Sequence, residues 1–426
     1  MIGTKEVMEN EKNLKSIIEF YLNGVEKYLA YDTVSDSLHS ILLLAELYNN
    51  LENTKKWDKI IYLKWNNIQE KSKGNGNSFF ARMGFFNGLA EICFIADILN
   101  SSTGNYQKLV YKLRTAFINT IPSYVHMLYE HMKEMKCPDY DCINGASGVI
   151  RYLLCPHDQA KDMAKLLVQY LVDVTNRKGE YPAWYIKNYN LPSEEDRILY
   201  ASGAINFSLS HGVSGILAIL IMALQKGICV SGQKSAIEIL AHKYILEYKV
   251  VENNIPYWPG MLSYEKFIKR EIDDLSRRMS WCYGSIGILR SLQLYEQAFP
   301  DYRLKREIED AVIFLSKIPC EEYLFDSPTI CHGYAGMLVV LNVINQEVKS
   351  DVIQKRVLEL VDILNNFFSE KNRFGFQNID FVSSEEGILK NVTEDLSFLT
   401  GSTGVILSML SVVRGETTFE KHLLIK

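Results

Sequence analysis

The feature that most constrains the fold is a pair of glycines, spaced G-x-x-G, that recurs along the chain before apolar runs. Five copies are complete: DCINGASGVIRYLL at 141–154, LSHGVSGILAILIMAL at 209–224, WCYGSIGILRSLQLY at 281–295, CHGYAGMLVVLNVI at 331–344 and FLTGSTGVILSMLSVV at 398–413. Glycine allows a sharp turn and a close approach of two backbones. The runs that follow are apolar on nearly every side, so each copy predicts a helix that is buried all round.

Two further segments resemble eroded copies of the same unit. The segment FFNGLAEICFIADIL at 85–99 keeps a single glycine, which we assign to the second position of the pair. The segment SLHSILLLAEL at 37–47 keeps only the apolar run. The chain therefore contains up to about seven repeats of the kind that stack on one another.

Charged, amphipathic segments separate the copies, for example DQAKDMAKLLVQYLVDV and RLKREIEDAVIFLSKI. Their apolar residues recur at three- and four-residue steps, as expected for a helix with one wet face. Such repeats bury their apolar faces only by stacking on neighbours. We therefore predict an all-α fold, an α/α toroid with about seven inner and seven outer helices in two layers. An open solenoid is the alternative, although neither end of the chain shows a polar capping repeat.

We expect residues 1–426 to form a single toroid domain. Two long spacers, 178–208 and 251–280, are aromatic, contain proline and lack helical periodicity, so they predict irregular insertions of loops or short strands. Both are expected at one end of the ring, and loops added to a rigid scaffold commonly carry the binding surface.

The composition excludes several classes of protein. With 47% hydrophobic and 23% charged residues the chain is typical of soluble globular proteins, and its net charge of −5 argues against a nucleic-acid partner. No apolar stretch approaches the roughly 20 residues of a membrane span, and the mixed-charge start has no signal-peptide core. We therefore expect a cytoplasmic protein. Its eight cysteines are too few for a disulfide framework in a chain of this length.

The turns before the inner helices would all emerge at one end of the toroid, and they hold most of the unusual polar residues. These are Asp141, His211, Arg278, Cys282, Tyr283, Cys331 and His332. Each alone has a simpler explanation, since Asp141 and His211 could cap helices and Cys331 could fill core space. Their occurrence in equivalent turns of adjacent repeats favours a shared site. Two thiolates and an imidazole that converge would make a tetrahedral zinc site with one open position.

The strings SHGVSG, WCYGSIG and CHGYAG, with PDYDCINGASG upstream, closely resemble the lanthionine cyclases that act on lantibiotic precursors. The resemblance runs from Asp141 to Gly404 with all motifs in order. It implies one zinc ion per chain, bound by three residues, and four more residues that line the reaction site. The implied zinc ligands are Cys282, Cys331 and His332, and the implied site residues are His211, Asp141, Arg278 and Tyr283.

In the reaction that this resemblance implies, a cysteine thiol of a dehydrated precursor peptide adds to dehydroalanine or dehydrobutyrine. Zinc would deprotonate the thiol, and His211 would protonate the α-carbon after attack. Asp141 would orient the imidazole, while Arg278 and Tyr283 would stabilise negative charge on the enolate oxygen. The sequence leaves open whether a dehydratase and an ABC exporter are further partners, in a complex at the inner face of the cell membrane.

Three other functions are compatible with parts of the pattern. The first is a non-catalytic, zinc-containing cyclase-like protein that binds peptides or thiols. The second is another zinc-thiolate alkylation enzyme, such as a prenyltransferase subunit, in which a carboxylate zinc ligand is expected. The third is an α/α-barrel glycosidase, which needs paired carboxylates, and Asp141 has no evident partner for that role.

Overall fold

The computed structural model describes residues 4–72, 79–155, 160–384, 387–415 and 417–426. Within these residues, seven helices are buried over most of their length and neighbour one another in an inner ring. They are α2 (Val34–Leu47), α4 (Leu89–Thr103), α7 (Ala146–Leu153), α10 (Val213–Gln225), α13 (Ser285–Ala298), α15 (Tyr334–Val348) and α17 (Ser402–Arg414). Each corresponds to one apolar run of the repeat.

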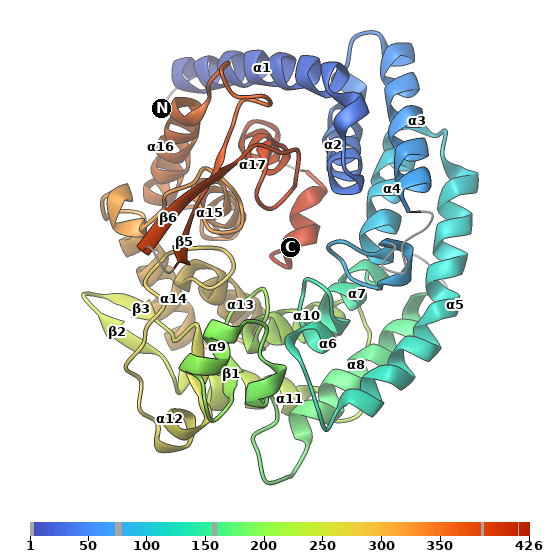
Figure 1. Ribbon diagram of the computed structural model, residues 1–426. Helices are drawn as coiled ribbons and strands as arrows, with labels where there is room; N and C mark the ends of the chain where they lie inside the picture. Colours follow the sequence, from blue (N-terminus) through green and yellow to red (C-terminus); the bar gives the residue numbers. More distant parts are fainter. Residues whose placement is uncertain (1–3, 73–78, 156–159, 385–386, 416) are drawn as a thin grey trace.

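Amphipathic helices alternate with the inner ones along the chain and cover them from outside (Figure 1). They are α1 (Thr4–Lys27), α3 (Thr54–Lys71), α5 (Gln107–His131), α8 (Ala160–Asn176), α11 (Gln233–Glu238) with a π-helical continuation (Ile239–Leu246), α14 (Tyr302–Leu315) and α16 (Asp351–Phe367). Among the described residues, no helix is long and apolar enough to span a membrane.

The two ends of the helical array meet. The last inner helix, α17, packs against the first, α2, and α1 lies along α16 and α17. This closure confirms the predicted α/α toroid and excludes the open solenoid. The two eroded N-terminal repeats therefore complete the ring in the same way as the others.

The glycine pair is explained by how each turn folds back over the start of its helix. The first glycine is the residue that caps the inner helix, as Gly284 caps α13, and a Cβ there would collide with the backbone of Ser280. The second lies in the first helical turn, where a Cβ on Gly336 would collide with the carbonyl oxygen of Ile330. Only glycine tolerates such close backbone approach at both positions.

One assignment in the eroded repeat was wrong. Gly88 caps α4, so it occupies the first position of the pair, and Glu91 occupies the second. The Glu91 side chain accepts hydrogen bonds from His39 at 2.9 Å and from the Asn87 backbone at 2.7 Å. This repeat therefore replaces the close backbone contact with a buried polar one.

Short helices and strands decorate the helical frame. The insertion at 178–208 holds α9 (Glu194–Leu199) and β1 (Ala204–Asn206). The insertion at 251–280 holds β3 (Ile255–Tyr257), which pairs with β2 (Val250–Glu252), as well as β4 (Met261–Ser263) and α12 (Tyr264–Lys269). Strands β1 and β4 pair antiparallel, with Ala204 opposite Ser263, so the two insertions form one structure. The two insertions contain the short strands that the sequence predicted and, in addition, the short helices α9 and α12, which it did not.

A further hairpin lies outside both predicted insertions. Strand β5 (Asn378–Ser384) pairs antiparallel with β6 (Gly387–Thr393), with Asp380 opposite Asn391. In the view of Figure 1 the hairpin lies over the inner helices near α15 and α17. A short helix, α6 (Cys137–Tyr140), also precedes the turn that carries Asp141.

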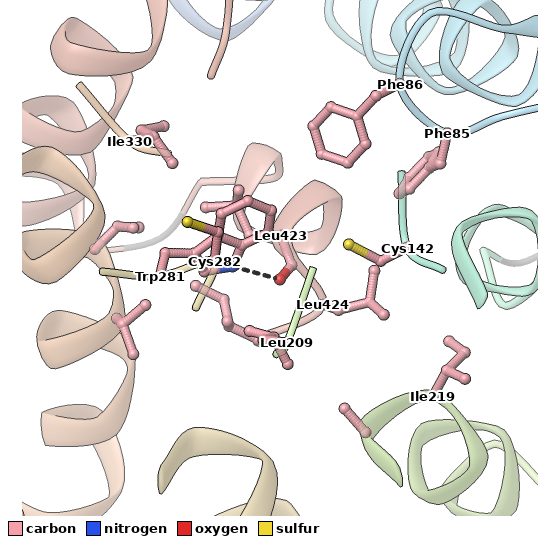
Figure 2. Packing of buried hydrophobic residues seen from close by; sticks show 14 of the residues in the cluster. Phe85, Phe86, Cys142, Leu209, Ile219, Trp281, Cys282, Ile330, Leu423 and Leu424 are labelled. Atoms are coloured by element: carbon pink, nitrogen blue, oxygen red, sulfur yellow. Dashed lines mark hydrogen bonds between the residues drawn. The ribbon is translucent and has the colours of Figure 1, made fainter. Parts of the chain in front are cut away.

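The C-terminal segment fills the middle of the toroid (Figure 1). It contains a short 3-10 helix (Phe419–Leu423), and its residues Leu423, Leu424 and Ile425 are fully buried. Figure 2 shows Leu423 beside Trp281, whose indole nitrogen donates to the Leu423 carbonyl oxygen at 3.0 Å. The C-terminal segment is therefore part of the packed interior and contacts the turn that carries Trp281.

Candidate active site

Backbone hydrogen bonds join the turn of each repeat to the turn of the next. The bonds run from Cys142 N to Ser210 O (3.0 Å), Leu209 N to Cys282 O (2.9 Å), Cys282 N to Cys331 O (3.4 Å) and Cys331 N to Leu399 O (2.9 Å). Because each bond links positions that are equivalent or one residue apart in the repeat, the turns stand in a fixed order around the ring. Residues that are far apart in sequence are thereby brought side by side.

Two of the predicted zinc ligands touch. The thiols of Cys282 and Cys331 are hydrogen-bonded to each other, and this bond lowers the pKa of the Cys282 thiol while it raises that of Cys331. Ser280 Oγ lies 3.4 Å from the Cys282 sulfur and supports the same shift. All eight cysteines are free thiols, so this contact is no disulfide. The pair presents one sulfur that is readily deprotonated, as a thiolate ligand requires.

His332 directly follows Cys331, and its ring faces the β5–β6 hairpin. Its Nε2 lies 2.7 Å from Asp380 Oδ1, although no hydrogen bond of normal geometry reaches this nitrogen from the described residues. Burial lowers the pKa of His332 below its ordinary value, which favours the neutral ring that can bind a metal.

The described part of the chain contains no group of three or more His, Cys, Asp or Glu side chains arranged to hold a metal ion. The three predicted ligands are neighbours, but their side chains are not already arranged around a common point. Their chemistry nevertheless fits zinc, which prefers sulfur and imidazole donors. The touching thiols and the adjacent His332 ring, whose lowered pKa favours the neutral form, are the structural signs of that fit.

The buried Asp141 pairs with the partly exposed His211 beside the thiols. His211 Nδ1 lies 2.6 Å from Asp141 Oδ2, while Asp141 Oδ1 accepts from the backbone nitrogens of Asn144 (2.7 Å) and Gly145 (2.9 Å). Burial alone would lower the pKa of His211, but the hydrogen bond and the charge of Asp141 outweigh it and raise that pKa. Asp141 thus both caps the turn and favours the protonated imidazole.

Tyr283 lies next to His211, with a ring-centre distance of 6.0 Å. Its hydroxyl accepts from Asn206 Nδ2 at 3.2 Å, and burial raises its pKa above the ordinary value, so it stays a neutral phenol. Asn206 belongs to β1, so the first insertion positions this tyrosine. A neutral phenol can donate a hydrogen bond to an oxygen that becomes negative.

Arg278 lies near His332 and pairs with Asp326. Its Nη2 is 3.1 Å from Asp326 Oδ2, both side chains are 40% exposed, and its charge acts on His332. The predicted residues therefore form two groups around the thiol pair, one with His211, Asp141 and Tyr283 and one with Arg278 and His332.

Sequence reasoning missed Asp380, Asp326 and Asn206, which contact the predicted residues. Asp380 lies in a hairpin that is not part of the repeat, so no motif marked it. Asn206 lies six residues before the capping glycine Gly212, and Arg278 lies six residues before Gly284. That shared spacing was the one signal that pointed to Asn206.

Three comparisons bear on the origin of this arrangement. Residues 32–424 match the model of the family described as lanthionine synthetase C-like protein. The chain is 26% identical over 423 residues to the nisin biosynthesis protein NisC of Lactococcus lactis subsp. lactis, covering 94% of this chain and 92% of that protein. The solved structure of nisin cyclase matches it with a TM-score of 0.78 and 22% identity over 97% of each chain, which shows a shared fold.

Proposed function

The chain belongs to the lanthionine synthetase C-like family, and from that premise we propose that it is a zinc-dependent lanthionine cyclase. It adds cysteine thiols of a dehydrated precursor peptide to dehydroalanine or dehydrobutyrine and so closes thioether rings. In each addition the carbon–sulfur bond forms and the carbon–carbon π bond breaks. The thiol loses its proton, and the α-carbon of the former dehydro residue gains one.

The observation that carries the proposal is the position of the His211–Asp141 pair beside two touching thiols. The reaction needs a site for the nucleophilic sulfur and a proton donor for the carbon that becomes basic. The thiols of Cys282 and Cys331 and the imidazole of His211 lie on adjacent repeats, so different residues can hold the sulfur and donate the proton. A metal site that only stabilised the fold would not require a neighbouring imidazole with a raised pKa.

Cys282, Cys331 and His332 would hold the zinc ion. When bound, zinc supplies a Lewis acid that deprotonates an incoming cysteine thiol near neutral pH. The weakly acidic Cys331 and the more acidic Cys282 would both bind as thiolates. The neutral ring of His332 completes the set of protein donors.

His211 would deliver the proton to the α-carbon. The Asp141 carboxylate fixes the ring through Nδ1 and favours its charged form, which leaves Nε2–H for the substrate. Tyr283, a neutral phenol beside the imidazole, would donate to the enolate oxygen. Arg278, which is half-exposed and always cationic, would hold that charge or the peptide.

Two variants test the division of roles. We expect about one zinc per purified chain, as a single site with three protein ligands requires. Cys282→Ala should lose most of the metal and all ring formation. His211→Asn should keep its zinc and bind dehydrated peptide, yet form rings roughly 100- to 10,000-fold more slowly, the usual range for general acid catalysis.

Mass spectrometry after thiol alkylation counts the rings, and elemental analysis counts the zinc. Full zinc occupancy in Cys282→Ala would contradict the metal assignment. Unchanged ring formation in His211→Asn would remove His211 from the mechanism. If the unmodified protein binds zinc and dehydrated peptide but closes no ring, it is the non-catalytic peptide- or thiol-binding protein instead.

The proposal extends to location and partners. We place the enzyme in the cytoplasm, at the inner face of the cell membrane together with a dehydratase and an ABC exporter. Co-purification with a tagged precursor peptide tests this association. Recovery of the cyclase with the peptide alone would restrict its partners to the substrate.

A further inference from the structure

The β5–β6 hairpin brings a carboxylate against a predicted zinc ligand. Asp380 Oδ1 lies 2.7 Å from Nε2 of His332, and the two side chains are 37% and 17% exposed. No hydrogen bond of good geometry from the described residues satisfies this nitrogen, so its contact with Asp380 is electrostatic. A carboxylate at this distance acts directly on the orientation and charge distribution of the imidazole.

Asp380 is itself held in place by a buried polar network. Asn378 Nδ2 donates to Asp380 Oδ2 at 2.6 Å, and Asn378 Oδ1 accepts from Ser327 Oγ at 2.9 Å and from Thr329 Oγ1 at 3.3 Å. The Ile379 backbone nitrogen also donates to Ser327 Oγ at 3.3 Å. Ser327, Thr329 and Asn378 are almost fully buried. The start of β5 is therefore fixed to the segment that leads into the Cys331–His332 turn.

This network lies outside the inner and outer helices of the toroid. The hairpin contributes no inner or outer helix, and Phe381, which follows Asp380, is exposed. The start of β5 is anchored near the Cys331–His332 turn, since Asn378 is buried there, whereas Phe381, three residues later, is exposed. The polar contacts of β5 therefore fix the hairpin to the segment before the Cys331–His332 turn rather than to the core.

We propose that Asp380 is a positioning residue for His332. Its carboxylate orients the imidazole and holds a proton on Nε2, so that the lone pair of the other ring nitrogen is available to the metal. Histidine ligands generally carry such a carboxylate or carbonyl partner, which fixes the tautomer and raises the basicity of the ligand. The inference rests on the proposed zinc site.

The test measures zinc affinity rather than ring formation. Asp380→Ala removes the carboxylate, Asp380→Asn keeps its shape but removes its charge, and Asn391→Ala changes the exposed residue opposite Asp380 in the hairpin. We expect Asp380→Ala to weaken zinc binding roughly 10- to 100-fold in competition with a chromophoric chelator, the usual effect of losing such a partner. Asp380→Asn should weaken it less, and Asn391→Ala should leave it unchanged.

Cobalt substitution identifies the ligand set. The cobalt-loaded Asp380→Asn variant should keep the visible absorption bands of the unmodified protein, because the metal donors do not change. Altered bands would mean that Asp380 binds the metal itself, and zinc affinity equal to the unmodified protein in Asp380→Ala would equally overturn the proposal. Circular dichroism of the metal-free variants checks folding, and Asp380→Asn carries the test if Asp380→Ala does not fold.

These outcomes are separable from failure of the proposed function. If the unmodified protein binds no zinc through Cys282 and Cys331, the metal site itself is wrong. If it binds zinc through them and Asp380→Ala binds as tightly, only the role of Asp380 is wrong.

Discussion

Replacing Gly336 by alanine tests how closely the fold and the metal site depend on the glycine pair. Gly336 lies in the first turn of α15, and a Cβ there would fall well inside van der Waals contact with the carbonyl oxygen of Ile330. Ile330 directly precedes Cys331 and His332. To make room for the methyl group, the turn must move away from the helix, and the two predicted ligands must move with it.

The free energy of unfolding reflects two opposing effects. Alanine gains at most about 1 kcal/mol over glycine within a helix. Overpacking costs about 1–3 kcal/mol and more where the obstacle is rigid, and here the obstacle is backbone rather than a side chain that can rotate. We therefore expect a net loss of about 2 kcal/mol. Zinc affinity should fall about tenfold or more, as it does when the support of a ligand is disturbed.

Two matched variants separate stability from metal binding. Gly148→Ala creates the same collision, with the carbonyl of Cys142, in a repeat without a predicted zinc ligand, so it should cost similar stability and leave zinc affinity unchanged. Gly179→Ala adds a methyl group where nothing lies within 4 Å and should change neither quantity. Urea unfolding of the metal-free proteins measures stability without the contribution of bound metal, and chelator competition measures affinity. A Gly336→Ala protein as stable as Gly179→Ala, with normal zinc binding, would refute this reasoning.

Two predictions concern pH. The raised pKa of His211 keeps its ring protonated to higher pH than free histidine. The rate of ring formation should therefore fall only as pH rises through that pKa. Asp141→Asn should move this fall to lower pH, and identical pH profiles of the two proteins would contradict the pairing. Burial lowers the pKa of His422 to about 4, whereas the unfolded chain titrates near 6.5. Its contribution to stability, roughly 3 kcal/mol, is therefore complete above pH 6.5 and lost as pH falls toward 4, which urea unfolding across that range should show. A free energy of unfolding that does not change between pH 7 and pH 4 would exclude a neutral buried His422.

The repeat made much of the site predictable. His211, Tyr283 and His332 each stand immediately before a capping glycine, so equal spacing in sequence becomes equivalent position in space. The backbone bonds between turns then bring the turns of adjacent repeats side by side. The pairing of His211 with Asp141 joins turns of adjacent repeats but not equivalent positions, because Asp141 lies four residues before its capping glycine and His211 lies one before.

The rest depends on contacts that no repeat encodes. Asp380 and Asp326 reach the site through a hairpin and a loop, whose positions are decided by packing rather than by period. The eroded repeat was ambiguous because one glycine fits either position of a pair. The structure decides it, since the Glu91 side chain lies where the close backbone contact is missing.

The buried C-terminal segment lies in the middle of the toroid, so the ring of helices is not an open tube. Arg290 Nε donates to the Ile425 carbonyl at 2.7 Å, and Arg151 donates to the Lys426 carbonyl at 2.6 Å, so the segment is tied to two inner helices. A peptide cannot be threaded along the axis and released on the far side. If the substrate is a precursor peptide, as proposed, each stretch of it must reach the site and leave it on the same side of the ring. Successive rings would then require repeated binding of the peptide rather than one passage through the toroid.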